Sequence, residues 1–259
     1  MNDPGAVEKY LLHRTKQSPI CAALIDPEDF TPEHASETAS KAIKAGVEMI
    51  LVGGSTLSDQ AKLDRVVKAL KDITKNITTS RDISRPPPVV LFPGNITGVS
   101  RFADAILFSS LLNSTNSYFI IGAQALGAME VYKARIESIP MGYLVFGSES
   151  ATSFIGQVNS LPPSKPSLAA IYALAAKYLG MRTLYLEAGS GSSAPISPET
   201  IQHVRKYYDG LMIVGGGITS REAADKAAKG GADVIVVGNL LQTTGYERTL
   251  REIVTVLRR

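Results

Sequence analysis

The stretch Ile213-Val-Gly-Gly-Gly-Ile218 ends a short apolar run in three glycines, and Val234-Ile-Val-Val-Gly-Asn239 repeats this pattern further along the chain. A segment with a helical pattern follows each run, which is typical of a buried strand that turns tightly into a helix. The last two units of a (β/α)8 barrel build a phosphate site in this way from backbone N–H groups, although tight turning alone also explains the glycines. The two stretches therefore predict an α/β protein with the (β/α)8 TIM-barrel fold, and an enzyme that handles a phosphorylated small molecule.

The rest of the chain shows the same alternation of strand-like and helix-like segments. Eight short runs carry apolar residues at successive positions, as strands do when both of their faces are buried. Helical patterns follow most of these runs, which is the order of parallel βαβ units. The predicted strands span residues 20–25, 49–52, 89–92, 105–108, 142–146, 183–187, 211–214 and 234–237, and the predicted helices span residues 32–45, 57–75, 118–136, 167–179, 198–208, 220–229 and 245–257.

One helix is missing from this pattern. Ten residues, Pro93 to Phe102, lie between the third and fourth predicted strands, and two of them are glycine. A crossover that contains a regular helix normally needs at least about a dozen residues. We therefore expect a degenerate or missing third helix, in a single domain that covers residues 1–259.

The composition suits one globular domain and argues against several other classes of protein. The length of 259 residues matches an eight-unit barrel, and 44% hydrophobic residues with a mean hydropathy of +0.07 leave enough apolar material for a core. The 27 basic and 24 acidic residues are interspersed, so the net charge of +3 argues against nucleic-acid binding. The single cysteine, Cys21, cannot form an intrachain disulfide. Neither a signal peptide nor a membrane-spanning stretch is evident, so we expect a cytoplasmic protein with at most peripheral membrane contact.

Polar residues follow the first two predicted strands, where a barrel of this kind carries its active site. The first strand ends in Ile25-Asp-Pro-Glu28, and Asp26 is a candidate magnesium ligand because Mg²⁺ needs only one or two carboxylates beside substrate phosphates. An ordinary helix-entry turn also explains an aspartate beside a proline. The second strand ends in Gly53-Gly-Ser-Thr56, and the hydroxyls of Ser55 and Thr56 could contact a phosphate or the metal. Capping of the next helix by Thr56 is an open alternative.

The sixth predicted strand ends in the most distinctive segment of the chain, Tyr185-Leu-Glu-Ala-Gly-Ser-Gly191. Because side chains alternate along a strand, Tyr185 and Glu187 point the same way, and a phenol with a carboxylate at the barrel mouth suits a small polyol. The glycines and Ser190 could wrap a phosphate with backbone N–H groups, unless the loop is simply flexible. We therefore predict a phosphate site at the C-terminal ends of strands 6 to 8. The candidate substrate-binding residues are Tyr185, Leu186, Glu187, Ala188, Gly189, Ser190, Gly191, Gly215, Gly216, Gly217, Gly238 and Asn239.

These segments together resemble the geranylgeranylglyceryl phosphate synthase family and its heptaprenyl-transferring relatives. The resemblance runs from about Ile20 to Asn239, and a shortened or missing third helix is also a property of that family. The Tyr-Leu-Glu segment and Phe108-Ser-Ser-Leu-Leu-Asn113 carry most of its specificity, because many phosphate-binding barrels share the glycine pairs. The other matching segments are Ile25-Asp-Pro-Glu28, Gly53-Gly-Ser-Thr56, Phe92-Pro-Gly-Asn95, Ile120-Ile-Gly-Ala-Gln124, Gly215-Gly-Gly-Ile218 and Gly238-Asn239.

The resemblance implies an activity and a division of the site. The implied reaction transfers a C20 prenyl group from geranylgeranyl diphosphate to the C3 hydroxyl of sn-glycerol 1-phosphate, with Mg²⁺, as the first ether-forming step of archaeal membrane-lipid synthesis. Asp26, with Ser55 or Thr56, would correspond to the metal site, and the candidate substrate-binding residues to the glycerol phosphate site. The catalytic candidates are then Asp26 and Glu187, which is placed to accept the hydroxyl proton as a general base. A homo-oligomer is also expected from the resemblance.

The chain departs from the family beside the Asp-Pro motif. Family members often carry a basic residue there, whereas Ala22 and Ala23 precede the motif in this chain and Phe30 follows its acidic run. The residues that contact the diphosphate on that side are therefore not identified. The C20 tail needs a long apolar groove, which we expect at the degenerate third crossover, lined by residues 96–102 and 111–119.

Three alternatives stay open. A heptaprenylglyceryl phosphate synthase would use the same site with a C35 donor. A phosphosugar isomerase or aldolase could use the same phosphate-binding site. Such an enzyme generally needs a Schiff-base lysine or an acid–base pair at the strand ends, and the predicted strands contain no lysine. A non-enzymatic sensor of a phosphorylated ligand would show no magnesium-dependent turnover.

Overall fold

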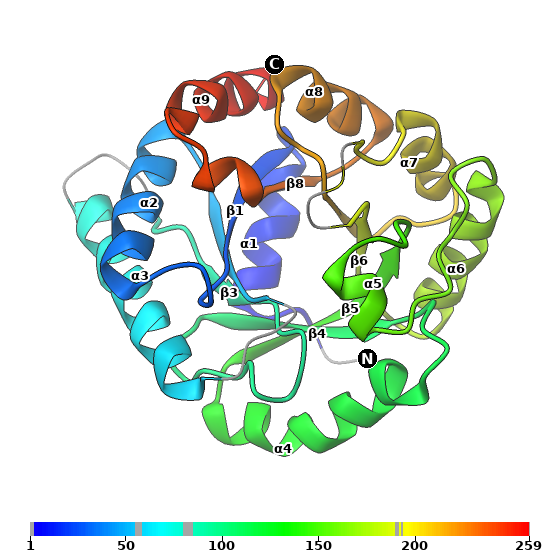
Figure 1. Cartoon of the computed structure of the whole chain (residues 1–259), viewed down its shortest axis with the longest axis horizontal. Helices are drawn as coiled ribbons and strands as arrows, with labels where there is room; N and C mark the ends of the chain where they lie inside the picture. Colours follow the sequence, from blue (N-terminus) through cyan, green and yellow to red (C-terminus); the bar gives the residue numbers. More distant parts are fainter. Residues whose placement is uncertain (1–2, 55–58, 80–84, 190–191, 193, 259) are drawn as a thin grey trace.

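The computed structural model describes residues 3–54, 59–79, 85–189, 192 and 194–258. In this part of the chain, eight parallel strands pair in sequence order and β8 pairs back with β1, so that the sheet closes into a barrel (Figure 1). The predicted (β/α)8 TIM-barrel fold is confirmed. The strands are β1 (Ile20–Ile25), β2 (Met49–Val52), β3 (Val89–Leu91), β4 (Ala105–Leu111), β5 (Glu137–Val145), β6 (Thr183–Glu187), β7 (Leu211–Gly215) and β8 (Val234–Val237).

The strands are apolar at successive positions because each face of the sheet is covered by a separate core. In β2, Met49 and Leu51 belong to a cluster inside the barrel, whereas Ile50 and Val52 belong to a larger cluster between the sheet and the helices. A strand with two buried faces cannot show the apolar and polar alternation of a half-exposed strand. The continuous apolar runs were therefore a reliable signal for these strands.

Helices cover the outside of the barrel, and several of their ends are set by local sequence. Thr31, Ser197 and Ser220 each accept a backbone N–H with the side-chain hydroxyl at a helix start. The helices around the barrel are α2 (Pro32–Ala45), α3 (Gln60–Thr79), α4 (Ala123–Ala134), α6 (Pro166–Tyr178), α7 (Pro198–Arg205), α8 (Arg221–Gly230) and α9 (Tyr246–Leu257). Shorter segments are α5 (Ala151–Ile155), the π-helix η1 (Tyr118–Gly122) and the 3₁₀-helix η2 (Asn239–Gln242). None of the described helices is long and apolar enough to cross a membrane.

The third crossover contains no helix, as the short spacing predicted. Residues 92–104, all of which are described, run from β3 to β4 as turns and bends. Helix α3 holds this segment in place, because Gln60 donates its side-chain amide to the carbonyl of Val99 at 2.7 Å and the Ser100 hydroxyl donates to Asp64 at 2.6 Å. The helical layer around the barrel is therefore incomplete between α3 and α4.

Several predicted boundaries were wrong, including the helix ends predicted at residues 75 and 208, which lie at Thr79 and Arg205, and the segments around β4 and β5. The fourth strand runs on to Leu111, and the fifth begins at Glu137 because the two strands pair from Ala105↔Glu137 to Leu111↔Tyr143. Proline and serine at the start of β5 concealed it from a search for apolar runs. The predicted helix at residues 118–136 begins as the π-helix η1 and gives way to β5 after Ala134.

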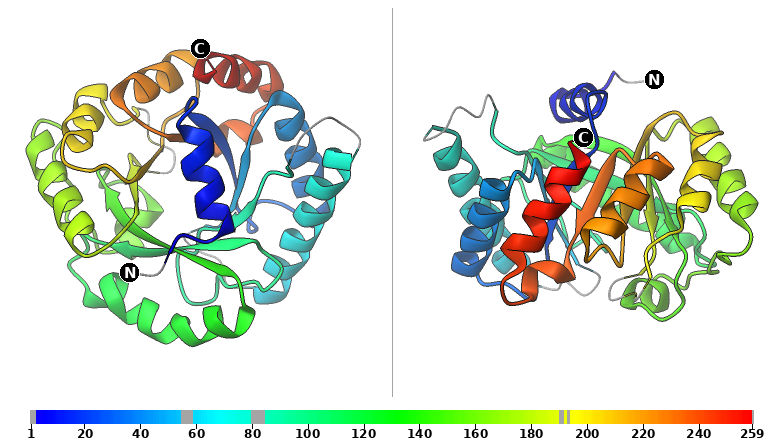
Figure 2. Two further views of the ribbon diagram at one scale, coloured as in Figure 1. Left: turned by 180° about the vertical axis from the view of Figure 1, so that it is seen from behind. Right: turned by 90° about the horizontal axis from the view of Figure 1, so that it is seen from above.

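The N-terminal helix α1 (Ala6–Thr15) was not predicted, because its mixed sequence shows little apolar periodicity. Figure 2 shows it lying across one end of the barrel, where Val7 and Leu11 join the interior cluster. Glu137 accepts the backbone N–H groups of Val7 at 2.7 Å and Glu8 at 2.8 Å. These are N–H groups of the first turn, which have no partner within a helix.

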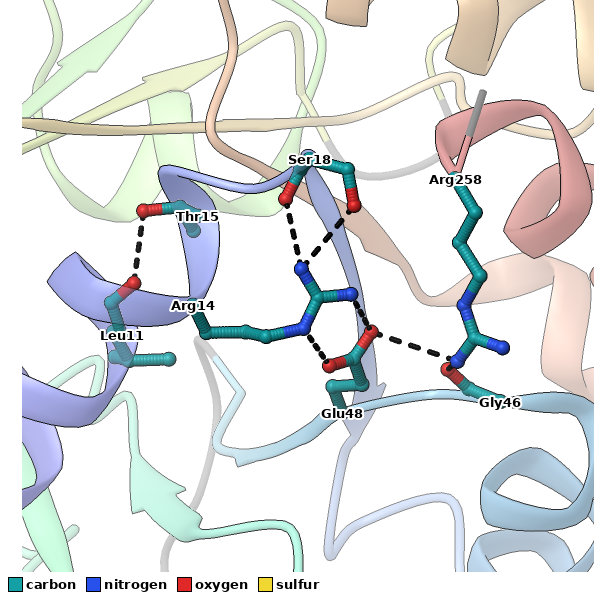
Figure 3. Close-up of polar contacts among 7 residues, drawn as sticks. All are labelled: Leu11, Arg14, Thr15, Ser18, Gly46, Glu48 and Arg258. Atoms are coloured by element: carbon teal, nitrogen blue, oxygen red, sulfur yellow. Dashed lines mark hydrogen bonds and ion pairs between the residues drawn. The ribbon is translucent and has the colours of Figure 1, made fainter.

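Two ion pairs also fix α1. The Glu8 carboxylate, with a side chain only 1% exposed, accepts two hydrogen bonds from Arg182, at 2.6 and 2.8 Å. At the other end of the helix, the Arg14 guanidinium forms a similar two-bond pair with Glu48, and Arg258 approaches the same carboxylate at 3.6 Å (Figure 3). Helix α1 therefore closes this end of the barrel, and the other end is left open for the site.

Candidate active site

A cavity of about 350 Å³ opens at the C-terminal ends of the strands. Figure 1 views the barrel from this end, opposite α1. The cavity begins at the barrel mouth and continues outward between β4 and α4, through the place of the missing helix. The predicted site residues that line it are Asp26, Tyr185, Glu187, Gly216, Gly217, Gly238 and Asn239.

Glu187 lies at the end of β6 with its carboxylate buried in the cavity wall. Its Oε1 atom accepts the backbone N–H of Gly189 at 2.7 Å, and its side chain is almost fully removed from solvent. Burial raises the pKa of Glu187 to about 7, although the hydrogen bond from Gly189 and the nearby Tyr185 hydroxyl act in the opposite direction. A carboxyl group with this pKa can exchange a proton near neutral pH, as a general base must.

Three aromatic rings form the floor of the cavity inside the barrel. Tyr185 stacks on Phe92 at 5.0 Å, and the ring of Tyr143 meets both of them edge-on at 5.3 Å. The Tyr185 hydroxyl is close enough to Glu187 to influence its pKa, yet it makes no hydrogen bond of normal geometry with any described residue. A buried hydroxyl without such a partner is well placed to bind a polar group of a ligand.

Sequence reasoning missed Tyr143, although a signal for it existed. Tyr143 is the neighbour of Tyr185 in the β5–β6 register and lies two residues before the end of its strand, as Tyr185 does. The boundaries of β5 were wrong, so this equivalence could not be used. Burial raises the pKa of Tyr143 well above its usual value, and contact with Thr152 of α5 opposes this rise.

Glycine is required after β7 because of the backbone conformation there and because of the position of the Glu187 side chain. Gly216 and Gly217 have φ angles of +82° and +71°, a region that other residues rarely adopt. A Cβ atom on Gly216 would lie 2.4 Å from Oε1 of Glu187, and one on Gly215 would lie 2.1 Å from the Tyr185 hydroxyl. The absence of side chains at Gly215 and Gly216 therefore lets this backbone pass close to the carboxylate and the phenol without a clash.

Not every predicted residue faces the cavity. Leu186 and Ala188 pack in the cluster between the sheet and the helices, because alternation along β6 turns them away from Tyr185 and Glu187. Side-chain contact between these two residues and a ligand in the cavity is therefore excluded. Gly189 supports Glu187 but does not line the cavity, and neither does Gly215. Ser55, Thr56, Ser190 and Gly191 lie outside the described residues.

Asp26 lines the cavity directly after β1. Its Oδ1 atom accepts the backbone N–H of Glu28 at 2.9 Å, and partial burial raises its pKa. A Cβ atom on Gly54 would lie 2.0 Å from Oδ2, so this glycine makes room for the carboxylate. Within the described residues, no group of three His, Cys, Asp or Glu side chains could hold a metal. The donor set therefore fits Mg²⁺ through Asp26, with Asp29 also lining the cavity, completed by substrate oxygens, since that ion is commonly held by one or two carboxylates and substrate phosphates.

The outer half of the cavity is apolar. Of the segments predicted to line the groove, Ile96, Val99, Leu111 and Phe119 do so. Residues of β4 and α4 that lie outside the two segments predicted to line the groove also line it: Ile106, Phe108, Ala123, Gly127 and Val131. Thr152 and Ile155 of α5 also line the cavity. None of the described lining residues is Lys, Arg or His.

The fold and the cavity define the class of the protein: a TIM barrel with a polar site at its C-terminal end and an apolar channel that leaves it through an incomplete helical layer. The family model named PcrB family matches residues 14–257. The chain belongs to the PcrB family.

Named relatives extend over nearly the whole chain. The sequence is 48% identical to the geranylgeranylglyceryl phosphate synthase of Cenarchaeum symbiosum, over 93% of this chain and 94% of that protein. It is also 48% identical to the geranylgeranylglyceryl phosphate synthase of Methanothermobacter thermautotrophicus, over 96% of this chain and 97% of that protein. The crystal structure of (S)-3-O-geranylgeranylglyceryl phosphate synthase from Thermoplasma acidophilum, in complex with its substrate sn-glycerol-1-phosphate, superimposes with a TM-score of 0.90 at 34% identity, covering 99% of each chain.

More distant structures share the fold alone. Thiamine phosphate pyrophosphorylase from Pyrococcus furiosus matches with a TM-score of 0.60 at 13% identity.

Proposed function

We propose that this protein is a prenyltransferase that joins a geranylgeranyl group, by an ether bond, to the C3 hydroxyl of sn-glycerol 1-phosphate. The observation that carries the proposal is one continuous cavity with a polar end at Glu187 and Tyr185 and an apolar end between β4 and α4. Such a cavity suits one small polar substrate and one long apolar substrate whose reacting ends meet. The identity of about 48% to two synthases of this name supports the choice of substrates.

The polar end provides groups for glycerol phosphate. The turns at Gly216–Gly217 and at Gly238–Asn239 bring strand-end backbone to the cavity, and barrels commonly bind phosphate at these two positions. The Tyr185 hydroxyl and the Glu187 carboxylate lie beside them and can bind the glycerol hydroxyls. A fixed phosphate would hold the attacking oxygen in position, which lowers the entropic part of the barrier.

The reaction balances with the groups available. The bond between C1 of the prenyl chain and the diphosphate oxygen breaks, and diphosphate leaves with the bonding electrons. The C3 oxygen of glycerol phosphate forms the new bond to C1, and Glu187 accepts the hydroxyl proton. Its pKa of about 7 allows it to be ionised before the step and to release the proton to solvent afterwards. We propose that Asp26 holds Mg²⁺ together with diphosphate oxygens, where the ion would supply Lewis-acid stabilisation of the leaving group.

The test is a transfer assay with donors of different length. Purified protein is incubated with Mg²⁺, labelled sn-glycerol 1-phosphate and farnesyl, geranylgeranyl or heptaprenyl diphosphate, and the label that enters organic solvent is counted. We expect extraction chiefly with the C20 donor and its loss when EDTA removes the metal. Extraction chiefly with the C35 donor would identify the heptaprenyl enzyme, and no transfer from any donor would contradict the proposal.

An isomerase or aldolase is less well supported. None of the eight strands contains a lysine that could form a Schiff base inside the barrel. A short phosphosugar would not fill the apolar channel, so these activities do not explain its presence. A cytoplasmic location and a homo-oligomeric state stay predictions.

A further inference from the structure

Strand β4 has an unpaired edge inside the apolar channel. Strand β3 ends at Leu91, whose partner is Ile106, whereas β4 continues to Leu111. Leu112 donates its N–H to Tyr143 on the β5 side, and successive backbone groups of a strand point to alternate edges. The carbonyl of Ser109, three residues earlier, therefore faces the other edge, where β3 no longer provides a partner.

The side-chain amide of Gln124 covers this edge. Its Nε2 atom donates to the Ser109 carbonyl at 2.5 Å and to the Phe119 carbonyl at 3.1 Å. Ser109, Phe119 and Gln124 all line the cavity. Gln124 therefore occupies the place that a β3 residue would take in a complete sheet, and it does so from the second residue of α4.

The chain before α4 is shaped to put Gln124 there. Residues Tyr118–Gly122 form a π-helix, and the Ser110 hydroxyl donates to the carbonyl of Ile120 at 2.7 Å, which ties this wide turn to β4. Single π-turns of this kind occur often at functional sites. The turn holds the N-terminal end of α4 beside the edge of β4. The small residues Ala123 and Gly127 of α4 leave room for the channel along this helix.

We propose that Gln124 is a positioning residue for the prenyl chain of the donor. By donating to the Ser109 carbonyl, it removes this acceptor from the channel wall, and its own Oε1 atom is buried, has no hydrogen-bond partner among the described residues and is not exposed to the channel. Without the amide, water would bind that carbonyl in the empty channel, and a prenyl chain would displace the water and leave the carbonyl unpaired. This inference rests on the proposed function, because it assumes that the channel holds a prenyl chain.

The test is a length series of donors with Gln124→Met, which keeps the size of the side chain and removes its donor. Apparent affinity is measured as KM, or as Ki against geranylgeranyl diphosphate for donors that do not turn over. For C15 and C20 diphosphates we expect a loss of about tenfold to hundredfold, the range given by one unpaired buried carbonyl. The C5 diphosphate, too short to lie along α4, should lose little, and the KM for sn-glycerol 1-phosphate should not change.

Two further variants keep the result interpretable. Gln124→Leu removes the donor with another apolar side chain, and it should reproduce the dependence on chain length if Gln124→Met does not fold. Gln202→Leu, at an exposed position on α7, makes a comparable amide-to-apolar change away from the channel and should have no effect. A loss that is equal for all donor lengths, or no loss, would overturn the role of Gln124. Absence of prenyl transfer by the unaltered protein would instead overturn the proposed function.

Discussion

Among single residues, Glu187 matters most, because the proposed proton transfer depends on the environment of its carboxyl group. A carboxylate acts as a base only when it is ionised, and burial raises the pKa of this group to about 7. The rate at low concentrations of glycerol phosphate should therefore increase with pH through about 7 and level off above it. The measurement is a profile of kcat/KM against pH from 5 to 9. A profile that is flat over this range would contradict a role for Glu187 as the base.

The substitution Glu187→Gln separates this role from simple binding. Glutamine keeps the shape of the side chain and cannot accept the proton, so we expect kcat to decrease by about 10²- to 10⁴-fold while the affinity for glycerol phosphate weakens modestly. Steady-state kinetics gives both values. The variant should also lose the increase with pH described above, and full activity would remove Glu187 as the base.

The sequence placed Tyr185 and Glu187 on one side of the strand, and the structure shows both lining the cavity. Alternation along a strand put Tyr185 and Glu187 on one face, and the positive φ angles of Gly216 and Gly217 explain the glycines that marked the turn. Alternation also turns the side chains of Leu186 and Ala188 toward the helices, which leaves only their backbone groups available to a ligand. Tyr143 was missed because its equivalence to Tyr185 depends on the register between β5 and β6, and the predicted boundaries of β5 were wrong.

At the scale of elements, the missing third helix has a direct consequence for specificity. Its absence was predicted from spacing alone, but the walls of the resulting channel depend on how α4 packs against β4. Gly127 lies in this wall, and a Cβ atom there would meet Ile96 at 3.8 Å, an ordinary contact. The backbone therefore leaves space at Gly127 that a larger side chain could fill.

We expect Gly127→Phe to shorten the prenyl chain that the enzyme accepts. A benzyl group would fill the channel beside Ile96, so transfer from C20 donors should decrease relative to transfer from C10 or C15 donors. The measurement is the ratio of kcat/KM values across the donor series. Ala125→Phe, at an exposed position of the same helix, is the matched control. An unchanged length preference in Gly127→Phe would contradict the location of the channel.

At the scale of the whole molecule, α1 and the active site occupy opposite ends of one barrel. The sequence missed α1 because its attachment depends on partners far along the chain, such as Arg182 for Glu8 and Glu48 for Arg14 (Figure 3). Long-range ion pairs leave no periodic signal in a local window. The eight strands were found because burial of both faces leaves a continuous apolar run in the sequence.

The ion pair between Glu8 and Arg182 should contribute to global stability. In Arg182→Met, the buried Glu8 carboxylate would lose both hydrogen bonds, and we expect the free energy of unfolding to decrease by about 2–3 kcal/mol. Urea denaturation followed by circular dichroism measures this change. Adding Glu8→Gln should recover part of the loss, because the uncompensated charge is removed. Arg248→Met, which breaks an exposed pair on α9, should change stability by less than about 1 kcal/mol.

The central claim is that one cavity holds both substrates, with their reacting ends between Glu187 and Asp26. The most direct measurement is a crystal structure with sn-glycerol 1-phosphate and an unreactive thio analogue of geranylgeranyl diphosphate. The account predicts phosphate at the turns of Gly216–Gly217 and Gly238–Asn239, the C3 hydroxyl facing Glu187, and the prenyl chain between β4 and α4 past Gln124. A prenyl chain bound outside this channel, or a glycerol phosphate whose C3 hydroxyl faces away from Glu187, would contradict it.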